Sequence, residues 1–143
     1  MRPPDAADHS GPTAEIIAVG AELLLGDGID TNSAWLADRL SELGVNVRRH
    51  TVVDDDIDDL TEVLRRAVEE RDVVVVGGGL GPTPDDLTRY AVARVAGVPL
   101  ERHDDLVERI REHFVARGRE MPERNLVQAH LPRGAQVIDP AGT

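Results

Sequence analysis

The sequence contains no cysteine and no lysine, and it has very few aromatic residues. Without cysteine the chain forms neither disulfides nor thiolate metal sites, and it has no cysteine nucleophile. A Schiff-base mechanism and a Walker-type phosphate loop both require lysine, so both are excluded. Aromatic residues make up only 2% of the chain against 41% for all apolar residues, so the core must be built from aliphatic side chains.

Long apolar runs and a basic face are also missing. No run approaches the roughly 18 apolar residues of a membrane span, and the N-terminal MRPPDAADHSGPT lacks the apolar stretch of a signal peptide. The formal net charge of −11 argues against general nucleic-acid binding. We therefore expect a soluble cytoplasmic protein without membrane or nucleic-acid partners, with a disordered tail at residues 1–13. One domain is expected over residues 14–143, cut short at its C-terminus.

Strand-like and helix-like apolar patterns alternate along the chain, which predicts a parallel sheet of right-handed βαβ units. Strands are predicted over residues 15–19, 45–53 and 73–76, with a last short strand at 136–138. Helices are predicted over residues 32–43 with Thr31 as N-cap and Gly44 just past the end, from the acidic run 54–56 onward, and over 85–96 and 105–117. Apolar residues recur at helical spacing on the first helix, at Trp35, Leu36, Leu40 and Leu43, and on the second they predict a buried stripe of Ile57, Leu60, Leu64, Ala67 and Val68. The continuous valine run at 73–76 is typical of a central strand covered on both faces.

Three predicted loops, residues 20–31, 53–56 and 77–86, leave the carboxyl ends of strands. Open parallel sheets bind their ligands at that edge. The third loop, GGGLGPTPDD, is rich in glycine, which lets backbone N–H groups approach a ligand closely. The dipole of the helix that follows favours a phosphate. A tight turn that needs small residues would also explain the glycines.

Acidic residues occur in all three loops. Thr83 and Asp86 have capping-box spacing, so a structural role suffices for one of Asp85 and Asp86. Mg²⁺, however, binds through one or two carboxylates together with substrate phosphates, so a carboxylate beside a phosphate site also suggests a metal. The sequence does not choose among the three aspartates at 54–56. Nothing local requires the acid at Glu22.

These segments resemble a known family. VGAELLLGDGIDTNSAWLADRL, TVVDDD, GGGLGPTPDDLT and NLVQAHLPRGAQVIDPAGT occur in the order and at the separations found in the N-terminal domain of competence/damage-inducible protein A (CinA). This domain falls within the MoaB/MogA-like molybdopterin-binding superfamily. The resemblance covers residues 14–143 and implies a three-layer α/β/α fold with a largely parallel central sheet.

The resemblance also implies roles for individual residues. Asp86 and Asp55 would serve the phosphoryl centre and, with Glu22, a divalent Mg, Mn or Co ion. The residues that would contact the ligand are Gly78, Gly79, Gly81, Thr83, Asn32 and Glu22, the last of which would also bind the metal. The chain departs from the family pattern at Gly77, where Thr or Ser is usual, and at Ala21, where Thr or Asp is common.

The resemblance leaves three functions open. The first is metal-dependent hydrolysis of the pyrophosphate bond of ADP-ribose, which the LGPTPDD signature favours. The second is molybdopterin binding or adenylylation in molybdenum cofactor biosynthesis, and the third is a non-catalytic regulatory domain. The ligand expected in each catalytic case is a nucleotide or a pterin phosphate. Relatives are commonly oligomeric, so a homodimer or larger assembly is expected.

Overall fold

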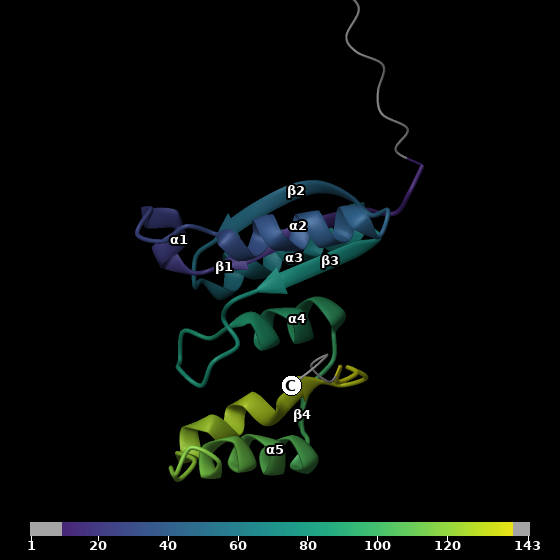
Figure 1. Ribbon diagram of the computed structural model, residues 1–143. Coiled ribbons are helices and arrows are strands. Elements are labelled where there is room, and N and C mark those ends of the chain that lie inside the picture. Colours follow the sequence, from purple (N-terminus) through teal and green to yellow (C-terminus); the bar gives the residue numbers. More distant parts are fainter. Residues whose placement is uncertain (1–9, 139–143) are drawn as a thin grey trace, which may run out of the picture.

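The computed structural model describes residues 10–138 (Figure 1). Most of the tail predicted at residues 1–13, and the last five residues, lie outside this range. The elements in chain order are β1 (Thr13–Val19), α1 (Ala21–Leu25), α2 (Thr31–Glu42), β2 (Asn46–Val53), α3 (Ile57–Glu70), β3 (Val73–Gly77), α4 (Thr88–Ala96), β4 (Leu100–Arg102), α5 (Asp104–Val115), the 3-10 helix η1 (Glu123–Ala129) and β5 (His130–Pro132).

The three long strands form a parallel sheet in the order β2-β1-β3. Helix α2 covers one face and α3 the other, while α4 continues the α3 layer past β3 (Figure 1). The C-terminal elements form a smaller unit beside α4, in which β4 and β5 pair antiparallel. No helix within residues 10–138 has the length and apolarity needed to cross a bilayer.

The main core lies between β1 and α3. Ile17 and Val19 pack against Leu60, Leu64 and Ala67, all of which are buried. These three α3 residues recur at helical spacing, so the amphipathic pattern correctly predicted the face of α3 that is buried. The core is aliphatic, as the scarcity of aromatic residues required.

One charged side chain is completely buried. Glu15 of β1 accepts hydrogen bonds from the Thr51 hydroxyl at 2.6 Å and from Arg66 at 3.0 Å. Arg49 and Arg71 lie 3.6 and 4.0 Å from its other carboxylate oxygen. Several arginines therefore compensate the buried charge. The sequence EIIAV gave no sign of this network, because its partners come from distant segments.

Several element predictions need correction. Residues 20–31 contain a short helix, α1, because Ala-Glu-Leu-Leu-Leu favours a helix between two glycines, and Gly26 ends it in the left-handed conformation. The N-cap of α2 is Asp30 rather than Thr31. Residues 136–138 form no strand, and the last strand is β5.

The prediction for the valine run was partly wrong. Residues 73–76 form strand β3, but within residues 10–138 this strand pairs only with β1 and lies at the edge of the sheet. Its four valines are half-buried. The apolar run therefore correctly predicted a strand, but its central position is not found in the part of the chain that the structure describes.

Candidate functional site

The loops that follow β1, β2 and β3 meet at one edge of the sheet, as the parallel topology requires. The N–H of Gly20 donates to the carbonyl of Val53 at 3.0 Å, which ties the end of β1 to the end of β2. The glycine loop after β3 is pressed against the end of β1, since a Cβ at Gly78 would lie only 2.2 Å from the Val19 carbonyl oxygen. The strand ends therefore form a single site.

Two positions of the glycine loop require glycine because of their backbone conformation. Gly78 and Gly79 have φ angles of 93° and 61°, in the region that side-chain-bearing residues rarely adopt. A Cβ at Gly79 would also lie 2.5 Å from the Thr88 hydroxyl. That hydroxyl donates to the Gly78 carbonyl at 2.8 Å, and the Thr88 N–H donates to the Gly79 carbonyl at 3.1 Å. The first turn of α4 thus fixes the loop.

Asp86 holds the second half of the loop. One of its carboxylate oxygens accepts from the N–H of Thr83 at 2.8 Å and from the Thr83 hydroxyl at 2.6 Å. This turn delays α4, which begins at Thr88 rather than at the predicted residue 85. The capping-box spacing was therefore read correctly as a contact between the two residues, but the contact closes a turn before the helix. The carboxylate also lies against Gly81, where a Cβ would come within 2.5 Å of it.

The contacts of Asp86 keep it ionised. Burial acts to raise the pKa of Asp86, but hydrogen bonds from the Thr83 hydroxyl and N–H outweigh it, with help from a backbone bond at Gly81 and the charge of Arg89. The net effect is a pKa below the usual value. Asp86 thus remains an anion that organises the loop over the whole neutral range.

Arg89 supports the glycine loop, and the sequence reasoning missed it. It is 5% exposed, and its guanidinium donates to the carbonyl of Gly81 at 3.0 Å and to that of Leu80. These bonds turn the carbonyls of the loop inward, toward α4. A buried cation in a helix with an ordinary pattern gives no signal in one sequence, because its partners are backbone groups.

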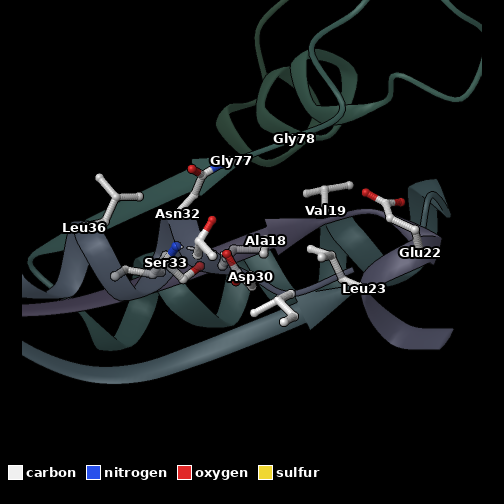
Figure 2. A pocket seen from close by; sticks show the side chains of 14 residues that line it. Ala18, Val19, Glu22, Leu23, Asp30, Asn32, Ser33, Leu36, Gly77 and Gly78 are labelled. Carbon is white, nitrogen blue, oxygen red and sulfur yellow. Dashed lines mark hydrogen bonds between the residues drawn. The ribbon is translucent and has the colours of Figure 1, made fainter. Parts of the chain in front are cut away.

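A cavity of about 180 Å³ lies between the end of β1, the start of α2 and the glycine loop (Figure 2). Of the predicted site residues, Glu22, Asn32 and Gly78 line it. Figure 2 shows Asn32 beside Gly77 and Glu22 farther along, beyond Val19. The other predicted ligand contacts, Gly79, Gly81 and Thr83, are not in its wall and instead shape the loop.

Three further polar residues of the cavity wall, Asp30, Thr31 and Ser33, were not predicted as site residues. The N–H of Ser33 donates to the Asp30 carboxylate at 2.9 Å and begins α2. Hydrogen bonds from the Ser33 side chain and N–H lower the pKa of Asp30. The Asp-x-x-Ser spacing was a usable sign of the cap, but nothing in it indicated that the cap faces a cavity.

The structure separates the three aspartates that the sequence left unresolved. Asp56 caps α3 by accepting from the N–H groups of Asp58 and Asp59 at 2.9 and 3.0 Å. Asp54 accepts from the N–H of Asp55 at 2.8 Å. Asp55 alone reaches the neighbouring loop, where it accepts from the N–H of Ala21 at 3.2 Å. Asp55 therefore anchors the residue next to Glu22.

The three carboxylates predicted to bind a metal therefore take different positions along the carboxyl-end edge of the sheet. Glu22 lines the cavity, Asp55 supports its loop and Asp86 bonds to Thr83. Within residues 10–138, no three or more histidine, aspartate or glutamate side chains gather closely enough to hold a metal ion. A cation at this edge would need ligands from its substrate in addition to a single carboxylate such as Glu22, which is a common arrangement for Mg²⁺.

The comparisons with known proteins agree with this geometry. A family model described as "Probable molybdopterin binding domain" matches residues 15–136. The chain belongs to this family. A CinA protein of Thermoplasma acidophilum has the same fold, with a TM-score of 0.81 and 34% identity over 92% of this chain and 78% of that one. The resemblance to the N-terminal domain of CinA is therefore confirmed.

The chain is also similar to a longer CinA-like protein and to a molybdopterin biosynthesis enzyme. A CinA-like protein of Anaeromyxobacter dehalogenans is 53% identical over 124 residues, which are 87% of this chain and 30% of the relative. The MoaB molybdopterin biosynthesis enzyme of Thermus thermophilus superposes with a TM-score of 0.55 at 24% identity, over 58% of this chain and 54% of that one. This likeness confirms the three-layer α/β/α fold. The chain spans about 30% of the length of its curated CinA-like relatives.

Proposed function

We propose that this CinA-type domain binds a phosphate-bearing nucleotide at the glycine loop and hydrolyses the pyrophosphate bond of ADP-ribose with the help of a divalent metal ion. One observation carries the proposal. Gly78 and Gly79, in the left-handed conformation, form a loop at the carboxyl end of β3, beside the cavity that Asn32 and Glu22 line. Backbone N–H groups in such a loop suit phosphate oxygens.

Some residues at the carboxyl-end edge of the sheet would contact the ligand, and others hold the loops in position. Asn32 offers both a donor and an acceptor to a ribose or phosphate oxygen. The carboxylate of Glu22 lies over Gly20, where a Cβ would meet both its oxygens at 2.6 Å. A side chain at position 20 would displace the Glu22 carboxylate from this place. Glu22 is the residue best placed to hold the cation.

Asp55 and Asp86 enter the proposal as residues that position the loops. The carboxylate of Asp55 fixes Ala21, and that of Asp86 fixes Thr83. Their direct participation in catalysis or metal binding stays a prediction. A bound divalent cation would offset the charge of the pyrophosphate and lower the pKa of an attacking water. The glycine-loop N–H groups would stabilise charge that develops on the phosphate oxygens.

The size of the cavity limits how much of the ligand it encloses. Typical ligand pockets measure roughly 300–1,000 Å³, whereas this cavity measures about 180 Å³. It therefore suits one end of a ligand as large as ADP-ribose, and the remainder would extend along the open edge of the sheet.

A second candidate function is binding of a molybdopterin phosphate. It is favoured by the description of the family and by the fold that the chain shares with MoaB. Asp85 precedes Asp86 in the loop, and both are acidic, which disfavours a further anionic group at that point. The negative charge of these two aspartates favours a ligand whose phosphates bind together with a metal cation.

The proposal is tested by incubating the protein with ADP-ribose and Mg²⁺, Mn²⁺ or Co²⁺ and following AMP by chromatography. AMP release is expected to depend on the metal and to fall at least about tenfold in Glu22→Gln, which loses the metal-binding charge. Glu42→Gln, at the exposed end of α2, is the matched control and should retain full activity. Absence of AMP with every metal would reject the hydrolase proposal. Binding of a pterin phosphate by the same protein would then favour the second candidate.

A further inference from the structure

A second, larger cavity lies in the C-terminal unit, between α5 and η1. It measures about 610 Å³, within the range of typical small-molecule pockets. The basic residues of its wall are Arg109, His113, Arg117 and Arg119. Among residues 10–138, no acidic side chain lines it, although the chain contains 27 acidic residues and only 16 arginines.

The basic side chains of this cavity lie on α5 and in the turn that follows it. Arg109 and His113 are four residues apart on one face of α5, and Arg117 and Arg119 come after the last residue of the helix, Val115. Of the acids of α5, Glu108 and Glu112 fall on another face, whereas Asp105 lies one turn before Arg109.

Most arginines of this chain have a carboxylate or carbonyl partner, but two in this cavity do not. Within residues 10–138, neither the guanidinium of Arg117 nor that of Arg119 makes a hydrogen bond or ion pair. Salt screens charges beyond about 10 Å, so the acidic residues far from the cavity contribute little to its potential, whereas these two arginines lie in its wall. The cavity is therefore locally attractive to an anion.

The remaining wall is suited to an organic group. Ile110 and Phe114 are half-buried and provide an apolar surface. Asn125 is buried, and its amide donates to the Gln128 side chain at 2.8 Å, while Gln128 donates to the carbonyl of Leu80 at 3.4 Å. Gln128 thus connects this cavity with the glycine loop of the first site.

We propose that the cavity between α5 and η1 is a second ligand site that binds a phosphate-bearing small molecule with a planar ring. Arg117 and Arg119 would hold the phosphate, and the ring would lie against Phe114. Stacking of a base on an aromatic side chain is worth about 1–3 kcal/mol, enough to distinguish such a ligand from inorganic phosphate. The site is independent of the proposed hydrolysis at the glycine loop.

The test is an NMR titration of the full chain with AMP and, separately, with inorganic phosphate. AMP is expected to shift the backbone amides of residues 113–119 and the side-chain amides of Asn125 and Gln128. In the double variant Arg117→Gln/Arg119→Gln the affinity measured at these signals should fall at least about tenfold. The control Arg48→Gln/Arg65→Gln removes the same charge from other elements and should bind AMP as the wild type does.

The outcomes separate the two sites. Shifts confined to residues 77–79 and Asn32 would report only the glycine loop and would overturn the second site while leaving the proposed function intact. Shifts at residues 113–119 that persist in the Arg117/Arg119 variant would also overturn it. If the two arginines only stabilise the carbonyl end of α5, the double variant melts at a lower temperature and the wild type shows no shifts there. Equal affinity for AMP and phosphate, or no effect of Phe114→Leu on AMP, would refute the role of the ring.

Discussion

Replacing Gly78 by alanine tests whether the glycine loop is held in place by contact with β1. Alanine at a φ of 93° carries backbone strain of about 1–3 kcal/mol. Its Cβ would also lie 2.2 Å from the Val19 carbonyl oxygen, a backbone atom of β1 that has little freedom to move. Relieving such overpacking typically costs about 1–3 kcal/mol more, so the free energy of unfolding should fall by about 2–6 kcal/mol.

The matched control is Gly77→Ala, one residue earlier, at the last position of β3. A Cβ at Gly77 meets no atom within 4 Å, and its φ is not positive. This substitution should therefore change stability by less than about 0.5 kcal/mol. Gly77→Ser would restore the hydroxyl that the family usually has, and the space around Gly77 should accept it equally well.

Thermal and urea denaturation, followed by circular dichroism, measure both variants. Domains of this size lose roughly 2–4 °C in melting temperature per kcal/mol, so Gly78→Ala should melt about 4–24 °C below Gly77→Ala. Equal melting temperatures of the two variants would refute the argument, because they would show that the loop moves freely away from β1.

Three further predictions concern charged residues. Glu15→Gln removes the charge of a fully buried carboxylate, while its partner Arg66 stays partly exposed to water, so it should cost about 1–3 kcal/mol in urea denaturation. Glu70→Gln, at an exposed pair, should cost less than about 1 kcal/mol, and equal effects would mean that Glu15 is not the centre of the network. Arg89→Met removes the donors to the carbonyl of Gly81, so hydrogen exchange in the glycine loop should accelerate, and unchanged exchange would contradict its role. The folded pKa of Asp86 lies below its usual value, so its stabilising contribution is present above about pH 4 and is lost as the pH falls through that lower folded pKa. Asp86→Asn should therefore be less stable than the wild type at neutral pH and approach its stability in acid. A constant difference in stability down to pH 2 would refute this assignment.

The sequence predicted those features that depend on neighbours close in the chain. The helical period of Leu60 and Leu64 fixed which side of α3 is buried, and Gly44, with a φ of 77°, follows the end of α2 as predicted. The same reasoning was less successful for Trp35, which repeats at helical spacing in α2 yet is 62% exposed. It lies instead beside Arg39, whose guanidinium is 5.9 Å from the ring centroid.

The candidate site was predicted in part, for the same reason. Parallel strands and the glycine loop indicated which edge of the sheet carries it, and Glu22, Asn32 and Gly78 do line one cavity there. The sequence could not show that Asp86 turns toward Thr83, because a side chain three residues from its partner can either cap a helix or close a turn. Nor could it show the buried position of Arg89.

By itself, then, the sequence determined an aliphatic α/β domain with a glycine loop at a strand end, and it excluded cysteine and lysine chemistry. Those properties follow from residue types and from short-range periodicity. Only the tertiary structure decided which acid faces the ligand edge, because the bond from Ala21 to Asp55 joins residues 34 positions apart. The three adjacent aspartates are chemically identical, and folding alone assigned each of them a different partner.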